Sequence, residues 1–371
     1  MTFINLCNVI LACVVLAKAT TSSFKPSLYD KTTVVCEAIR RTPSKEGVNI
    51  DIKYVDINPG APTSIIMVHG WPSLWSSWSN QIQEFQEDYH LVIPDLRGFG
   101  ESTHPGDAQS SGTLQDMVND LVCVLKDAKT SSAICMGHDW GSAICYEAAR
   151  LRPDIFTAVI GVVVPYVPSA GPYVPIQDLT PHFPTLTYQL FFDHQPQAAV
   201  DELERDIRRT IRGTLRTFAS PPPIQFLKSN KSFLDAWSDI EEIPAVPFFS
   251  PEEEDYFVDQ YTTSGFKHTL QFYSNYNRFL GWKIANEQGN HTISQPVLAI
   301  YPTEDPVADW VEVSEILQSA SFLPNLTTKV LPGSHWVHLE YPEKFNFIVR
   351  QWLMAIVATK LSRDSGFGDE L

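Results

Sequence analysis

The fold is decided by Gly137-His138-Asp139-Trp140-Gly141 and the segments on either side of it. Residues 131–136 form a short apolar run that predicts a buried strand, and residues 142–150 place small and apolar side chains at helical spacing. A strand, a tight turn and a helix, with glycines two residues before and after the centre, match the G-x-nucleophile-x-G pattern. The glycines let the turn close so sharply that the central side chain stands clear of the backbone. That central residue is Asp139, where hydrolases that act on esters usually have serine.

Asp139 also has a simpler interpretation. Aspartate is favoured at the N-cap of a helix, and short glycine motifs occur by chance. The rest of the chain has to decide between a nucleophile and a cap.

Composition limits the classes of protein to consider. The chain has 371 residues, 44% of them hydrophobic, which is enough for a large core and one or two domains. Its net charge of −16 argues against a nucleic-acid partner, because no basic excess remains for phosphates. We therefore expect an acidic protein with a small-molecule ligand.

Both termini predict entry into the secretory pathway. Residues 3–16 are apolar but too short to span a bilayer comfortably, and Ala17-Lys18-Ala19 fits a small-x-small cleavage site. We predict a signal peptide over 1–19; a retained anchor, which would bring membrane association, is the alternative. The end, Gly368-Asp369-Glu370-Leu371, resembles the signal for retention in the endoplasmic reticulum lumen, so the protein is expected to be secreted or retained there. Candidate glycosylation sites are Asn230, Asn290 and Asn325.

Four cysteines remain beyond the predicted signal peptide: Cys36, Cys123, Cys135 and Cys145. They lack metal-ligand spacing and are too sparse for a disulfide framework. Cys135 and Cys145 flank the central turn, so we predict buried thiols there.

Strands and helices alternate along most of the chain, which predicts an α/β fold whose mostly parallel sheet has helices on both faces. Residues 114–125 form an amphipathic helix capped by Thr113. From Pro165 to Gln295 the sheet pattern stops, and helical periods, including one helix over 198–217, take its place. We predict a core of residues 20–165 and 296–371, with residues 166–295 inserted as a helical cap. The predicted strands cover residues 48–56, 64–68, 90–93, 131–136, 158–164, 296–301 and 327–331.

Two loops follow predicted strands. Residues 64–68 run into His69-Gly70-Trp71-Pro72; proline has no N–H, so the backbone of Trp71 is the candidate donor to an oxyanion. The loop after residues 90–93 contains Asp95 and Arg97, which we predict to pair with each other and fix that loop.

Three residues stand at the ends of successive sheet elements in the order of a hydrolase triad: Asp139, Asp305 and His335. A carboxylate nucleophile suits attack on a saturated carbon that bears a leaving group, and the product is an ester of Asp139. His335 would then take a proton from water, and Asp305 would fix the tautomer of the His335 imidazole. The N–H groups of Trp71 and Trp140 would stabilise the oxyanion by hydrogen bonds. This chemistry requires neither metal nor cofactor. The leaving group is a halide or the oxygen of an epoxide.

The sequence resembles the epoxide hydrolases of the α/β-hydrolase superfamily from about residue 41 to residue 353. The motifs at 69–72 and 137–141 match the family's oxyanion and nucleophile motifs. Gly265-Phe266 with Leu270-Gln271-Phe272-Tyr273 is similar to the segment with one epoxide-activating tyrosine. The segment from Tyr188 to Pro196 resembles the other, with one residue more than usual before the proline. Ser334 stands where the family usually has glycine, and Ser274 where a basic residue is common.

The resemblance implies conversion of a lipophilic epoxide and water to a vicinal diol, with Tyr188 and Tyr273 activating the epoxide oxygen. A haloalkane or haloacid dehalogenase on the same fold is the alternative, and Trp71 argues against it, because the resembling dehalogenases place a polar halide-binding side chain there. A ligand-binding protein without activity is a third hypothesis.

Overall fold

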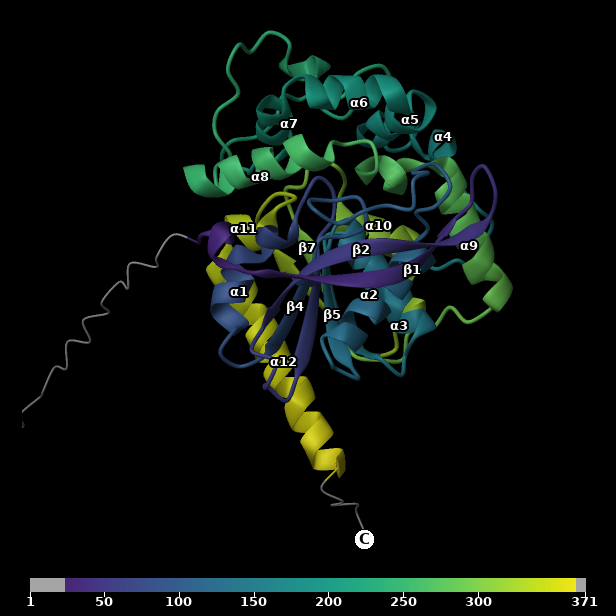
Figure 1. Ribbon diagram of the computed structural model, residues 1–371, viewed down its shortest axis with the longest axis vertical. Coiled ribbons are helices and arrows are strands. Elements are labelled where there is room, and N and C mark those ends of the chain that lie inside the picture. Colours follow the sequence, from purple (N-terminus) through teal and green to yellow (C-terminus); the bar gives the residue numbers. More distant parts are fainter. Residues whose placement is uncertain (1–23, 365–371) are drawn as a thin grey trace, which may run out of the picture.

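Eight strands form one sheet in this computed structural model, which describes residues 24–364 (Figure 1). Their order across the sheet is β1-β2-β4-β3-β5-β6-β7-β8. The pairs from β4 to β8 are parallel, whereas β2 is antiparallel to both β1 and β4. The prediction of a mostly parallel sheet is therefore confirmed. The strands are β1 (Lys31–Arg40), β2 (Glu46–Ile57), β3 (Ser64–Val68), β4 (His90–Pro94), β5 (Ala133–His138), β6 (Phe156–Val162), β7 (Val297–Pro302) and β8 (Leu326–Leu331).

Helices cover both faces of the sheet, and the side chains of β3 show why. Successive residues of a strand point to opposite faces. Ile66 and Val68 pack with helices α2 and α3, while Ile65 and Met67 pack on the other side with α1 and α12. A strand buried on both faces is apolar throughout, which is the pattern of residues 64–68. The helices of this part are α1 (Ser79–Phe85), α2 (Leu114–Asp127), α3 (Trp140–Leu151), α10 (Trp310–Ile316), α11 (Val337–Glu340) and α12 (Pro342–Asp364).

The segment between β6 and β7 is helical. Every residue from 163 to 296 is described, and none belongs to the sheet. In Figure 1, α4 to α8 gather above the sheet and form the predicted cap, whose boundaries at residues 165 and 296 stay predictions. Its helices are α4 (Ile176–Leu179), α5 (Tyr188–His194), α6 (Pro196–Arg205), α7 (Ile207–Thr214), α8 (Pro251–Ser264) and α9 (Asn275–Gln288).

The single helix predicted over 198–217 is wrong, because the chain breaks at Asp206. There the backbone is extended, with φ −147° and ψ 92°, and the carboxylate accepts a hydrogen bond from the N–H of Arg209. An aspartate that caps a new helix in this way competes with continuation of the old one.

The loop after β4 is held differently from the predicted Asp95–Arg97 pair, which is wrong. The Arg97 guanidinium binds both carboxylate oxygens of Asp120 on α2, at 2.5 and 2.6 Å. Asp95 instead lies 2.8 Å from Nζ of Lys31. The two partners, Asp120 on α2 and Lys31 on β1, come from elements that pack beside the loop.

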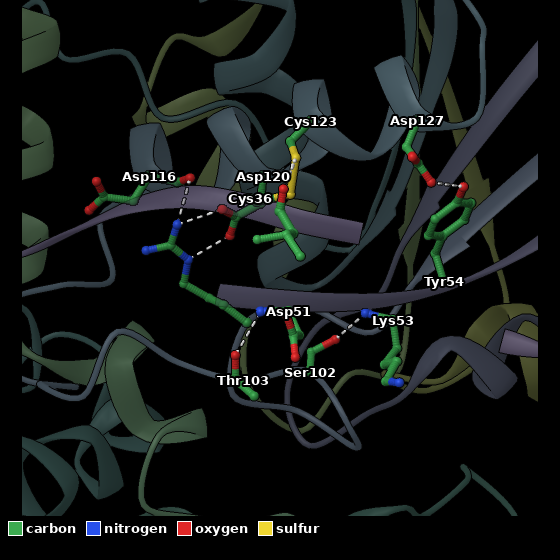
Figure 2. Close-up of a disulfide and its surroundings, with 12 residues drawn as sticks. Cys36, Asp51, Lys53, Tyr54, Ser102, Thr103, Asp116, Asp120, Cys123 and Asp127 are labelled. Carbon is green, nitrogen blue, oxygen red and sulfur yellow. Dashed lines mark hydrogen bonds and ion pairs between the residues drawn. A yellow bond between two sulfur atoms is a disulfide. The ribbon is translucent and has the colours of Figure 1, made fainter. Parts of the chain in front are cut away.

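The four cysteines form two disulfides, so the prediction of thiols is wrong. Cys36 of β1 is joined to Cys123 of α2, and Cys135 of β5 to Cys145 of α3. Figure 2 shows the first bond between its strand and helix, with Tyr54 donating nearby to Asp127 of the same helix. Pairing depends on the approach of the two side chains in space, which spacing in the sequence does not reveal.

Replacing Cys36 and Cys123 together by serine should lower the free energy of unfolding by about 2–4 kcal/mol, because the bond closes a loop of 87 residues in the unfolded chain. Urea unfolding measures this change. An unchanged midpoint and slope would show that the link contributes nothing to stability.

Both predicted terminal signals, residues 1–19 and 368–371, lie outside the described residues. Within residues 24–364, no helix combines the length and apolarity that crossing a membrane requires.

Candidate active site

Asp139 occupies the turn between β5 and α3 in a strained conformation, with φ 55° and ψ −123°. The flanking glycines make the turn possible. A Cβ on Gly137 would lie 2.1 Å from the Gly141 oxygen, and one on Gly141 would lie 2.0 Å from the Val68 oxygen. Although Asp139 stands at the N-cap position, its side chain does not accept the hydrogen bond from the second or third N–H of α3 that an N-cap residue makes. Its carboxylate is therefore available for another role.

Two backbone N–H groups hold the Asp139 carboxylate. The N–H of Trp71, which follows β3, donates to Oδ1 at 2.9 Å, and the N–H of Trp140 also donates to this carboxylate. Oδ1 thus lies at the predicted oxyanion donor Trp71, and Oδ2 is left on the side of His335. The structure thus brings together Trp71, Asp139 and Trp140, three of the predicted site residues.

His335, which follows β8, links the two predicted acids. Its Nδ1 lies 2.8 Å from Oδ2 of Asp305, and its Nε2 lies 3.7 Å from Oδ2 of Asp139. Asp305 follows β7 and has no exposed side-chain surface. The hydrogen bond at Nδ1 places the proton there and leaves the lone pair of Nε2 facing the nucleophile.

Burial and charge act in opposite directions on these groups. Burial by itself lowers the pKa of His335, but the Asp305 and Asp139 carboxylates raise it above its ordinary value. Burial raises the pKa of Asp139, while His335 and the N–H groups of Trp71 and Trp140 favour its charged form. The two carboxylates thus favour the protonated form of the buried histidine, and the histidine favours the charged form of Asp139.

Trp310 is a site residue that the sequence did not reveal. Its indole N–H donates to Oδ2 of Asp305 at 2.6 Å, the same oxygen that faces His335, and the N–H of Val307 donates to Oδ1 at 2.8 Å. These two donors fix the carboxylate so that it can orient the imidazole. A tryptophan five residues after an acid has no recognisable spacing signal.

Replacing Trp310 by phenylalanine should lower kcat by about tenfold, since the lost hydrogen bond to a charged acceptor is worth roughly 1.5 kcal/mol. Steady-state kinetics measure this, with KM expected to change less than kcat because phenylalanine keeps an aromatic ring in the cavity lining. A kcat equal to that of the unmodified protein would remove Trp310 from the supporting residues.

The two predicted tyrosines meet in the cap. Tyr188 is the first residue of α5, Tyr273 is the last of the 3₁₀ helix η5 (Thr269–Tyr273), and their ring centroids are 5.7 Å apart. Nε2 of Gln189 donates to the Tyr188 hydroxyl at 3.3 Å. Burial, and next the charge of Asp139, raise the pKa of Tyr188 to about 12. Burial raises the pKa of Tyr273 as well, so both hydroxyls stay protonated near neutral pH.

One cavity of about 590 Å³ joins these groups. It lies between the carboxyl ends of the strands and the helical segment, and most of its lining is apolar. An apolar ligand with a single reactive polar group fits such a space. The predicted site residues that line it are Trp71, Asp139, Trp140, Tyr188, Tyr273 and His335, whereas Asp305 lies behind His335.

Among the described residues, no three histidine, cysteine or acidic side chains are grouped so that they can hold a metal ion.

Comparisons with known proteins identify the fold family and its relatives. Residues 63–342 match the model of the alpha/beta hydrolase fold family. Epoxide hydrolase A of Mycobacterium tuberculosis is 30% identical over 308 residues, which cover 80% of this chain and 92% of that protein. Bifunctional epoxide hydrolase 2 of Sus scrofa is 27% identical, and the match covers 80% of this chain and 52% of that longer protein. The crystal structure of epoxide hydrolase A from Mycobacterium thermoresistibile superposes with a TM-score of 0.69 at 25% identity, covering 86% of this chain and 98% of that one.

Proposed function

The chain belongs to the α/β-hydrolase fold family and is an epoxide hydrolase, and we propose that it opens its substrate through a covalent ester on Asp139. The observation that carries this mechanism is the convergence of a carboxylate, a histidine–aspartate pair and two protonated tyrosines on one apolar cavity. The tyrosines suit an alkoxide, which leaves poorly unless a proton reaches it.

In the first step, Oδ2 of Asp139 attacks a ring carbon, and the carbon–oxygen bond of the epoxide breaks. The departing oxygen keeps the electron pair and takes a proton from Tyr188 or Tyr273. The products are a hydroxyalkyl ester and a tyrosinate, which recovers its proton from solvent. Oδ1 becomes the carbonyl oxygen of the ester and stays hydrogen-bonded to the N–H of Trp71.

In the second step, Nε2 of His335 takes a proton from water, and the resulting hydroxide attacks Cγ of Asp139. The charge that develops on Oδ1 is held by the N–H groups of Trp71 and Trp140. Collapse expels the diol oxygen, which receives the proton from His335, and the Asp139 acid then ionises. Asp305 stabilises the imidazolium between the two transfers.

The experiment that tests this mechanism is a single turnover in ¹⁸O-water with enzyme in excess over an aryl or alkyl epoxide. The first diol should contain an unlabelled oxygen from Asp139, and the label should appear in the Asp139 carboxylate. Label in the first diol would instead show direct attack by water. Matched haloalkanes run alongside should release no halide, since the Trp71 indole N–H is already bonded to Oγ1 of Thr269.

The pH profile of kcat should fall on the acid side with a midpoint above 6.5. His335 must be neutral to accept the proton of water, and its pKa is raised chiefly by Asp305, whose charge remains while Asp139 is an ester. Replacing Asp305 by asparagine removes the carboxylate that raises this pKa most, so the midpoint of the residual activity should move to lower pH. An unmoved midpoint would assign the acid limb to another group.

We also propose that the protein passes through the secretory pathway. Disulfides persist mainly in oxidising compartments, and the chain has two. Asn230, Asn290 and Asn325 are exposed, as glycosylation requires. Expression in eukaryotic cells, followed by glycosidase treatment and N-terminal sequencing, tests glycosylation and the cleavage predicted after residue 19. An unmodified chain that still begins at Met1 would contradict the proposal.

A further inference from the structure

The cavity contains a cation that the hydrolytic steps do not use. Arg278, on α9, lines the cavity beside the tyrosines. Its Nε donates to the backbone oxygen of Phe272 at 2.8 Å, and Nη2 donates to Oε1 of Gln189 at 2.8 Å. Both acceptors are uncharged. The remaining nitrogen, Nη1, donates to none of the residues in the described part of the chain.

The charges of the cavity lining show that Arg278 is the unmatched group. The lining has two acids, Asp139 and Glu147. Asp139 faces His335, and Glu147 accepts two hydrogen bonds from the guanidinium of Arg150, at 2.8 and 2.6 Å. Across residues 24–356, whose side chains the structure describes, no carboxylate pairs with Arg278 within 4 Å.

Asp193 is the acid whose charge acts on Arg278 from farther away, and both of its carboxylate oxygens have other partners. Oδ1 of Asp193 accepts a hydrogen bond from the N–H of Asn275 at 2.8 Å, and Oδ2 lies 3.7 Å from Nε2 of His194. Aromatic rings supply the rest of the surroundings: the guanidinium carbon lies 4.9 Å from the Trp140 ring centroid and 5.8 Å from that of Tyr273. Ring faces offset only part of the free energy lost when a cation leaves water.

A carboxylate on the substrate would supply the missing partner. A guanidinium that holds two neutral acceptors and keeps one nitrogen free is a donor for an anion, and such charge-assisted hydrogen bonds are strong where water is excluded. An anionic substrate would otherwise be repelled by the charge of Asp139. A positive charge in the lining removes that penalty.

We propose that Arg278 is the anion-binding subsite of this epoxide hydrolase and selects epoxides that carry a carboxylate close to the ring. The proposal rests on the function given above. Arg278 lies within 5.8 Å of the Tyr273 ring, whose hydroxyl would hold the epoxide oxygen, so only a few bonds can separate ring and carboxylate. The rest of the substrate would fill the apolar part of the cavity.

The test compares short epoxy acids with their primary amides, which have nearly the same shape and no charge. The measured quantity is the ratio of kcat/KM for acid and amide, because a change in the shared chemical steps cancels in it. In the unmodified enzyme the acid should be preferred. In Arg278→Gln the ratio should fall by about 10- to 100-fold, the range expected when a hydrogen bond between charged groups is lost.

A second variant keeps Arg278 but gives its guanidinium a carboxylate partner from the protein. Gln189→Glu places a protein carboxylate on Nη2, so it should also lower the ratio. The matched control is Lys283→Gln, which removes the same charge from the exposed side of α9, where Lys283 pairs with Glu287 at 3.9 Å. Lys283 does not line the cavity, and the ratio should stay at its original value.

Equal use of acid and amide by the unmodified enzyme, or a ratio that Arg278→Gln and Gln189→Glu leave unchanged, would overturn the proposal. A fall of the same size in Lys283→Gln would also overturn it, by assigning the preference to net charge. Failure of the proposed mechanism would give a different result. The ¹⁸O label from water would then enter the first diol for acids and amides alike, whatever the ratio of their kcat/KM values.

Discussion

His335→Gln should stop turnover and leave the enzyme carrying its substrate as an ester on Asp139. Oδ2 of Asp139 still attacks the epoxide, but no base remains at Nε2 to activate water. We expect kcat to fall by roughly 10⁴-fold, as when a member of a catalytic triad is removed. Intact-protein mass spectrometry should show one added substrate mass per chain, and peptide mapping should place it on Asp139.

Asp139→Ala is the matched variant, because it loses the same activity without forming an ester. Its diol formation should fall at least as far, and its mass should remain that of the free protein. An adduct in Asp139→Ala would move the nucleophile to another residue. A fully active His335→Gln enzyme would place the base elsewhere.

Replacing Tyr188 and Tyr273 together by phenylalanine should abolish ring opening while the ester-hydrolysing groups stay in place. Each tyrosine is expected to contribute about 10²-fold to kcat/KM, similar to one donor of an oxyanion hole, and the loss in the double variant should be larger. Without a proton donor, the epoxide oxygen leaves as a free alkoxide. The measurement is the rate of the first turnover, together with the absence of any ester.

The two single variants separate the roles of the tyrosines. The Tyr188 hydroxyl oxygen accepts a hydrogen bond from Gln189, which stabilises a tyrosinate, so Tyr188→Phe should cost at least as much as Tyr273→Phe. Circular dichroism and thermal unfolding serve as controls for the buried aromatic cluster around both rings. Full activity in the double variant would mean that the two side chains only pack.

The nucleophile Asp139 can be predicted from the sequence because the pattern that places it is local. A strand, two glycines and a helix are enough to place Asp139 on a sharp turn, and the clash that a Cβ on Gly137 or Gly141 would cause explains why those positions need glycine. The relative order of Asp139, Asp305 and His335 was also readable, because parallel strands end at one edge of the sheet. Tyr188 and Tyr273 came from resemblance alone, as aromatic residues in a helical segment have no distinguishing spacing.

The α/β architecture, the sharp turn at Asp139 and the order of the triad are therefore predictable from the amino-acid sequence, because they follow from hydrophobic period, glycine positions and strand ends. Contacts between side chains that are distant in the sequence emerge only when the elements pack. Cys36 bonds Cys123, Arg97 selects Asp120 rather than Asp95, Trp310 donates to Asp305, and Arg278 lines the cavity without an acid beside it. The reason is physical: a local pattern fixes where a side chain points on its own element, whereas its partner depends on how the elements pack.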